Sequence, residues 1–121
     1  MDPEALLEQL PDAVVASDCD GIIRVWNAAA AKLFGYAADE AIGQSLDLII
    51  PERLREAHWK GYHAAVAAGA TKYSGKPLTT RAVPRSGERL YVAMQFGVLH
   101  DAQGRAWGAV AVARETERPV H

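Results

Sequence analysis

Alternating apolar and polar positions mark two short stretches near the start of the chain and three longer ones near its end. DAVVASD and GIIRVWN flank residues 18–21, where Asp-Gly supplies the positive φ that a tight turn requires. KPLTTRAV, RLYVAMQFGVL and AWGAVAVARE are separated by the turns PRSGE and HDAQGR. This pattern predicts five strands connected largely by hairpins, and therefore an antiparallel sheet.

Helical patterns occupy the interval between the second and third predicted strands. Asn27 is suited to cap AAAAKLFG, which Gly35 ends, and ADEAIG adds a short helical turn. Pro51 suits the first turn of a longer helix that ends near Gly69. We therefore expect an α+β domain in which these helices cover one face of the sheet, with a pocket between the two layers.

The same periodicities indicate which side chains share a face. On the longer helix, one stripe follows the spacing i, i+4, i+8, i+11, i+12 and consists of Leu54, His58, Tyr62, Ala65 and Val66. On the fourth predicted strand, one face carries Leu90, Val92, Met94, Phe96 and Val98. On the last strand, one face carries Trp107, Ala109, Ala111 and Ala113. His58 thus lies among apolar residues, whereas His63 is on the flank of the stripe and is the weaker ligand candidate.

Composition and charge exclude several classes of function. The 121 residues have a net charge of −2 and no basic patch, which argues against nucleic-acid binding by this chain. We expect no membrane span or signal peptide, and a single cysteine, Cys19, is compatible with the reducing cytoplasm. We find no nucleophile-base arrangement, paired carboxylates or Gly-rich phosphate loop, so we expect no enzyme activity.

Several segments together resemble a PAS domain, over roughly residues 3–118. They are LPDAVVASDCDGIIRVWNAAAAKLFGYAADEAIGQSL, the helix after Pro51, RSGERLYVAM and the closing ARETER. The resemblance implies a strand order of 2-1-5-4-3 and a sensory module whose output domain lies elsewhere in a longer signalling or transcription-regulatory chain. We expect an N-terminal amphipathic helix at 1–11, the PAS domain at 12–118 and a tail at 119–121. Members of the family often dimerise through such a helix, which implies a homodimer.

The family's known ligands can be compared with particular residues. Flavin-binding members need a cysteine in a Gly-x-x-Cys stretch, where this chain has Leu46 at the last position, so no flavin is expected. Haem-binding members of the rhizobial oxygen-sensor kinase type carry an axial histidine a few residues after Pro-Glu. Pro51 and Glu52, followed by His58, have similar spacing. The alternatives are a haem-free pocket for a small organic molecule and a purely structural dimerisation module.

The haem hypothesis assigns roles to further residues by the same resemblance. Met94 and Phe96 would face a bound gas, and Ala109 and Ala111 would leave room for the planar group. If its face is inward, the indole N–H of Trp107 would donate to the gas. Leu78 occupies the place of a distal arginine in the rhizobial sensors, with Arg81 three residues on, so the oxygen-switching contact of that family is not carried over. Leu54 and Tyr62 complete the candidate site.

Overall fold

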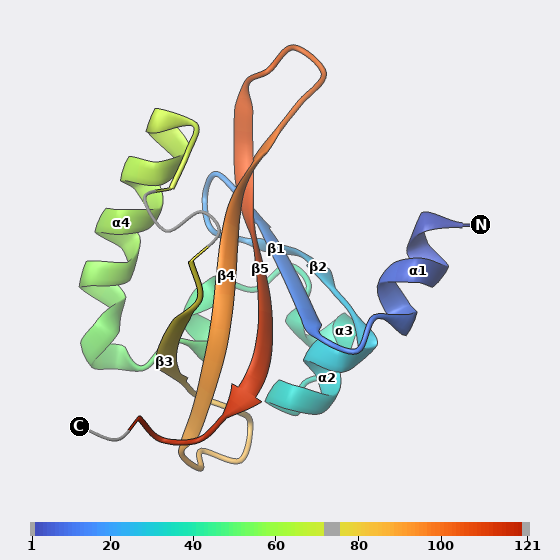
Figure 1. The fold of residues 1–121 in the computed structure, drawn as a ribbon, viewed down its shortest axis with the longest axis vertical. Coiled ribbons are helices and arrows are strands. Elements are labelled where there is room, and N and C mark those ends of the chain that lie inside the picture. The colour runs from blue at the N-terminus through green and yellow to red at the C-terminus, as the bar shows by residue number, and fades with distance from the viewer. Residues whose placement is uncertain (1, 72–75, 120–121) are drawn as a thin grey trace.

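The sheet has five antiparallel strands in the predicted order. The computed structural model describes residues 2–71 and 76–119, so the last two residues of the predicted tail lie outside the described part. The strand order is β2-β1-β5-β4-β3, as the sequence predicted (Figure 1). The strands are β1 (Ala13–Asp18), β2 (Ile23–Trp26), β3 (Leu78–Ala82), β4 (Leu90–His100) and β5 (Ala106–Thr116).

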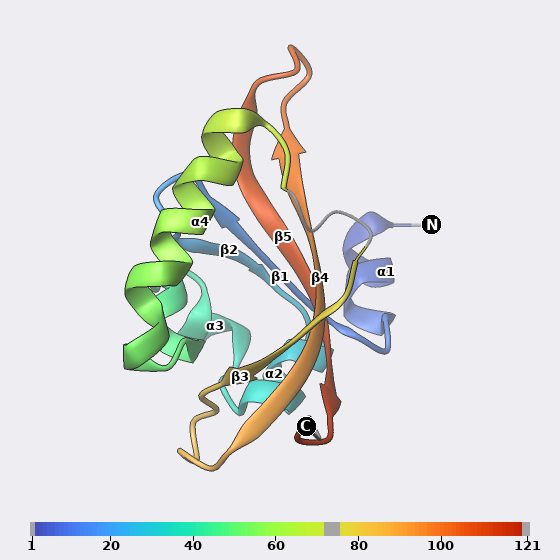
Figure 2. The ribbon, with the colours of Figure 1, turned by 60° about the vertical axis from the view of Figure 1, so that its left-hand side comes forward.

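Helices between β2 and β3 lie on one side of this sheet, and the N-terminal helix lies on the other (Figure 2). The helical elements are α1 (Pro3–Gln9), α2 (Ala28–Phe34), α3 (Ala38–Ala41), η1 (Leu46–Ile49), η2 (Glu52–Leu54) and α4 (Arg55–Ala68). The predicted longer helix is therefore divided. Pro51 has an extended backbone (ψ 138°), a 3₁₀ turn follows it, and α4 begins only at Arg55. In the described part of the chain, no helix has the length and apolar character needed to cross a membrane.

The hydrophobic core lies between α2, α3 and the central strands. Its fully buried side chains include Phe34, Ile23 and Val92, and the indole of Trp26 packs against Phe34 at 5.4 Å between ring centroids. Leu90 is also buried, in agreement with the predicted inward face of β4. Trp59 and Tyr62 of α4 are only partly buried and pack against this core.

Asn27 is a buried polar residue that connects three segments of the fold. Its Oδ1 accepts hydrogen bonds from the backbone N–H groups of Val14 (2.9 Å) and Ala30 (3.0 Å). Its Nδ2 donates to the carbonyls of Leu7 (2.9 Å) and Asp12 (3.0 Å). The predicted cap of α2 is therefore confirmed, and the same side chain also ties α1 and the start of β1 to the core.

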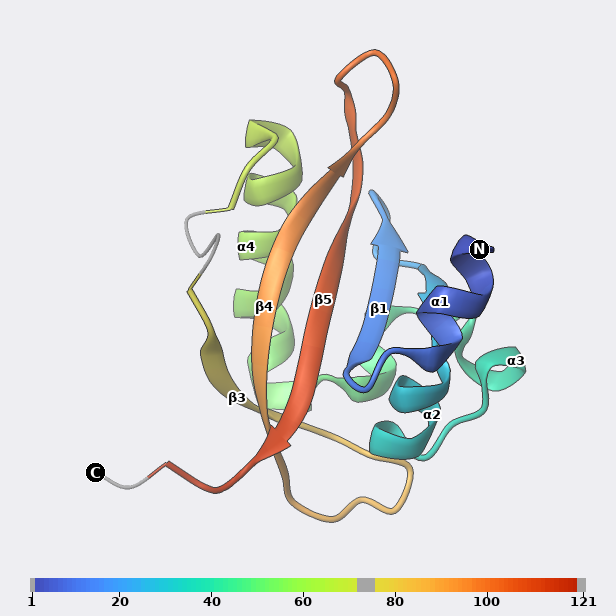
Figure 3. The same ribbon diagram turned by 45° about the vertical axis from the view of Figure 1, so that its right-hand side comes forward.

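The apolar side of α1 is only partly covered. Leu6 is 48% exposed and Leu10 is 36% exposed, although α1 contacts α2 (Figure 3). The helix is held by the Asn27 hydrogen bond to Leu7 and begins with a side-chain cap from Asp2. The homodimer that the sequence suggests through this helix stays a prediction.

Candidate ligand-binding cavity

A cavity of about 350 Å³ lies between the sheet and the segment that contains η1, η2 and α4. This volume is near the lower end of the ~300–1,000 Å³ typical of small-molecule sites. Its apolar wall is formed by Val15, Leu46, Ile49, Ile50, Leu54, Ala57, Leu78, Ala82, Met94, Phe96, Ala109, Val110 and Ala111. The polar residues at the wall are Ser17, His58, Tyr62, Thr80 and Arg81. Such a lining suits an apolar molecule that makes a few specific polar contacts.

The strand register explains how the sheet side of the cavity is built. Phe96 pairs with Ala111, which in turn pairs with Val15, so these three side chains lie on the same face. Met94 pairs with Leu78 on the neighbouring strand. Because side chains directly opposite one another point to the same side of a sheet, the large residues of β4 stand beside small residues of β5. The alanines leave the space that becomes the cavity.

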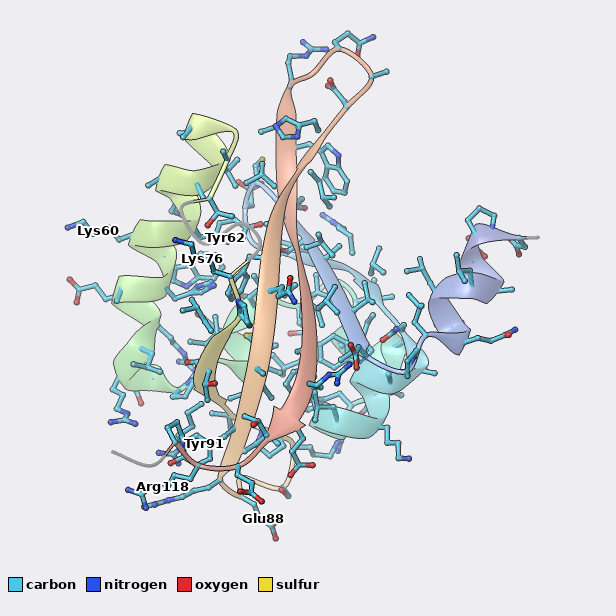
Figure 4. All side chains as sticks on the ribbon, viewed as in Figure 1. Lys60, Tyr62, Lys76, Glu88, Tyr91 and Arg118 are labelled. Atoms are coloured by element: carbon cyan, nitrogen blue, oxygen red, sulfur yellow. The ribbon has the colours of Figure 1, made fainter. Side chains whose placement is uncertain are left out.

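The helix side of the cavity carries the predicted stripe of residues. Leu54 precedes α4, and His58 and Tyr62 follow it at intervals of four, which brings all three to the cavity. Figure 4 shows Tyr62 directed toward the strands and Lys60 pointing away from them. None of the 14 residues of α4 is fully buried. The helix therefore borders the cavity rather than packing tightly onto the sheet.

His58 combines partial burial with an unsatisfied nitrogen. Its Nδ1 is buried and has no hydrogen-bond partner. The imidazole lies edge-on to Trp59, with ring centroids 4.7 Å apart, and 5.7 Å from the ring of Tyr62. Burial lowers the pKa of His58 below its usual value; the charge of Asp47 partly opposes this effect and His63 adds to it. The imidazole is therefore mainly neutral at pH 7 and has a lone pair available for a ligand.

Tyr62 spans the cavity edge and contacts β1. Its hydroxyl lies 2.8 Å from Ser17 Oγ and donates to the carbonyl of Asp18 at 2.5 Å. Burial is the main cause that raises the pKa of Tyr62, and the charge of Asp18 acts in the same direction, so the phenol stays protonated at neutral pH. This hydroxyl pair gives the cavity a polar end beside its apolar wall.

Among the predicted site residues, Trp107 is the exception. The cavity is lined by the others, namely Leu54, His58, Tyr62, Leu78, Met94, Phe96, Ala109 and Ala111. Trp107 is 38% exposed and does not line the cavity. The β4–β5 register shifts between Leu99 and His100 and passes over Trp107, and β1 ends opposite Gly108. A bulge beyond the end of a neighbouring strand turns a side chain away from the regular face, and Trp107 accordingly lies outside the cavity that the other predicted site residues line.

Four other residues named in the sequence analysis can now be placed. Leu46, at the position where a flavin-binding member would carry cysteine, lines the cavity, and Cys19 is exposed in the β1–β2 turn. Arg81 borders the cavity but pairs with Tyr91, which places its side chain on the opposite face of β3 from Thr80. His63 is exposed and stacks on Trp59.

Sequence reasoning missed several of the cavity's polar and apolar residues. Ser17 lies two positions after Val15 on β1, so alternation along that strand would have found it. Thr80 follows Leu78 in the same way on β3. Ile49 and Ile50 come from a 3₁₀ turn and the residue after it, and no periodic signal assigns such positions to a face.

Comparisons with known proteins agree with this architecture. A family model described as PAS fold matches residues 2–116. The sensor protein FixL of Bradyrhizobium diazoefficiens is 41% identical over 54 residues, which are 45% of this chain and 11% of FixL. The oxygen sensor protein DosP of Escherichia coli is 26% identical over 103 residues, which are 85% of this chain and 13% of DosP. The crystal structure of a PAS domain from Colwellia psychrerythraea superposes with a TM-score of 0.80 at 21% identity, covering 93% of this chain and 92% of that one.

Proposed function

Since this chain belongs to the PAS family, we propose that it is a sensory domain whose cavity holds haem, with His58 as the axial ligand of the iron. The observation that carries the proposal is a mainly neutral imidazole with a buried nitrogen that has no protein partner, at the wall of an apolar cavity. Haem-binding pockets combine such an axial side chain with apolar surroundings. The resemblance to an oxygen sensor supports a diatomic gas as the signal.

The other cavity residues fit this group in character. When bound, haem supplies an iron atom with a position open to a diatomic gas. Ala109 and Ala111 provide room for a planar molecule beside the sheet, and Met94 and Phe96 exclude water from it. His58, on α4, would hold the iron from the side of the cavity opposite these strands. The chain therefore offers one ligating side chain in a largely apolar enclosure, with the hydroxyl groups of Ser17, Tyr62 and Thr80 at its wall.

We infer that α4 transmits occupancy of the cavity to the sheet. A helix without fully buried residues loses little packing when it shifts, so a ligand that contacts both layers can favour one arrangement over another. The matched residues span 11% of the length of FixL and 13% of that of DosP, which supports a sensory domain within a longer protein. An output domain in that longer chain would respond to the arrangement that the ligand favours.

A small organic ligand without iron is the second candidate. It is favoured by the cavity volume of about 350 Å³, which is modest for a cofactor site, and by the hydroxyl groups of Ser17, Tyr62 and Thr80 at the wall. These groups would orient an alcohol, ketone or phenol whose remaining surface contacts the apolar wall.

Absorbance of the purified protein tests the haem proposal. Protein expressed with a haem precursor should show a Soret band. His58→Ala should abolish the band, and His63→Ala, a change at the exposed histidine of the same helix, should retain it. Circular dichroism would show that both variants are folded. A colourless wild type that also fails to take up added haemin would overturn the proposal, as would a band that survives in His58→Ala. A colourless protein whose melting temperature rises with small aromatic alcohols would support the second candidate.

A further inference from the structure

The attachment of α4 to the rest of the domain depends on side chains along one edge of the helix. None of its residues is fully buried, so apolar packing alone does not fix its position. Arg55, Trp59 and Tyr62 follow the spacing i, i+4, i+7 and therefore share a face. All three form hydrogen bonds to the chain's N-terminal half. Tyr62 reaches β1, as described above, and the other two reach the segment around η1.

Trp59 connects two segments that are separated in sequence. Its Nε1 donates a hydrogen bond to Asp47 Oδ1 at 2.8 Å, in η1. Its ring lies directly against Gly21 in the β1–β2 turn, where a Cβ atom would stand 2.0 Å from the Cη2 atom of the indole. Only a residue without a side chain allows this approach. Trp59 thus packs on the turn and bonds to η1 at the same time.

Arg55 strengthens the same attachment point. Its Nε donates to the carbonyl of Ile50 at 3.1 Å, and its guanidinium donates to the carbonyl of Asp47 at 3.2 Å. Asp47 therefore contacts both α4 side chains. Its carboxylate accepts the bond from Trp59 and lies 3.8 Å from Nε of Arg55, and its backbone carbonyl accepts the bond from Arg55. The indole of Trp59 also lies edge-on to the imidazole of His58, so displacement of the indole changes the surroundings of that imidazole directly.

We propose that Trp59 is the positioning residue of the site: its contacts with Gly21 and Asp47 fix the place of α4 and so present His58 to the cavity. The inference rests on the proposed function only in treating His58 as the residue that meets the ligand. Arg55 and Tyr62 restrain the helix on either side of Trp59, but neither contacts the β1–β2 turn through a ring, as Trp59 does.

Two glycine substitutions provide a matched test in ligand-free protein. Gly21 and Gly104 have nearly equal positive φ values of 76° and 79°, so an alanine introduces similar backbone strain at each. At Gly104 a Cβ atom meets nothing within 4 Å, whereas at Gly21 it collides with Trp59. The readouts are the NMR signals of the His58 ring at a fixed pH of about 8, where a free imidazole is neutral, and amide hydrogen exchange along α4.

Gly21→Ala should shift the His58 ring signals and speed exchange in α4 by about tenfold relative to β4 and β5, while Gly104→Ala should change neither. Trp59→Phe, which keeps a ring but removes the hydrogen bond to Asp47, should act in the same direction. If Gly21→Ala unfolds the domain, Trp59→Phe decides by the same two readouts. Equal His58 signals and α4 exchange in wild type, Trp59→Phe and the folded glycine variants would overturn the proposal. No haem is present in these experiments, so failure of the protein to bind haem leaves the test intact.

Discussion

Filling the cavity with protein atoms should stabilise the ligand-free domain and abolish binding. Ala111 is suited to this change because it lines the cavity on β5, opposite Phe96 and beside Val15. Ala111→Leu directs an isobutyl group into a space of about 350 Å³. The free energy of unfolding should then rise while ligand binding is lost. A substitution that merely disrupts the fold would lower both.

The magnitude follows from the added carbons. Leucine has three more carbon atoms than alanine, and burial stabilises by about 0.8 kcal/mol for each, or roughly 2.4 kcal/mol in all. Fixing the leucine rotamer costs about 0.5–1 kcal/mol. We therefore expect the free energy of unfolding to rise by about 1.5 kcal/mol, which corresponds to an increase in melting temperature of roughly 5 °C for a domain of this size.

Urea denaturation of ligand-free protein measures the change, with Ala93→Leu as control. Ala93 is on β4 in register with Arg114, on the opposite face of the sheet from Met94 and Phe96. The control should alter the free energy of unfolding by less than about 0.5 kcal/mol and leave haemin uptake unchanged. If Ala111→Leu instead lowers the free energy of unfolding by 1 kcal/mol or more, about the usual cost of overpacking, the cavity has no room for the added side chain and the reasoning is refuted.

Three further predictions concern buried polar groups. Because burial holds the pKa of His58 below its usual 6.5, the unfolded chain binds a proton first as the pH falls. The free energy of unfolding of the wild type should therefore fall below about pH 6.5. The slope should be less than about 1.4 kcal/mol per pH unit because the ring is partly exposed, and the decrease should be smaller in His58→Phe. Asn27→Ala should lower the free energy of unfolding by about 3 kcal/mol, since it removes a cap and leaves buried backbone groups unpaired. Tyr62→Phe should cost about 1 kcal/mol through the lost bonds to Ser17 and Asp18.

Urea titrations at several pH values test all three. Parallel pH curves for wild type and His58→Phe would contradict the assignment of a lowered pKa to this imidazole. If Asn27→Ala lowers the free energy of unfolding by less than 1 kcal/mol, water must replace the side chain as the hydrogen-bond partner of these backbone groups. A Tyr62→Phe variant as stable as wild type would mean that the hydroxyl contacts contribute nothing net.

Alternation and helical spacing were enough to predict the sheet, its faces and most of the cavity. Met94 and Phe96 both line the cavity because a regular strand has a side-chain period of two. His58 was placed at the cavity because its stripe on the helix is otherwise apolar. These are local regularities, and the structure preserves them wherever the elements are regular.

The features that could not be predicted from the sequence lie at bulges, at strand ends and in long-range contacts, where the periodic side-chain pattern does not apply. Trp107 has the correct phase for the cavity, but the bulge and the end of β1 depend on how three strands are aligned. Trp59 contacts Gly21, 38 positions before it, and Asp47, 12 positions before it. The types of these residues do not predict the contacts. Long-range contacts of this kind are determined by tertiary packing rather than by local pattern.

A crystal structure of the protein treated with haemin tests the central claim most directly. The account predicts one haem in the cavity between α4 and β4–β5, with its iron bound by the imidazole of His58. Haem held at the surface through another side chain such as His63, or a cavity occupied by an organic molecule without iron, would contradict it.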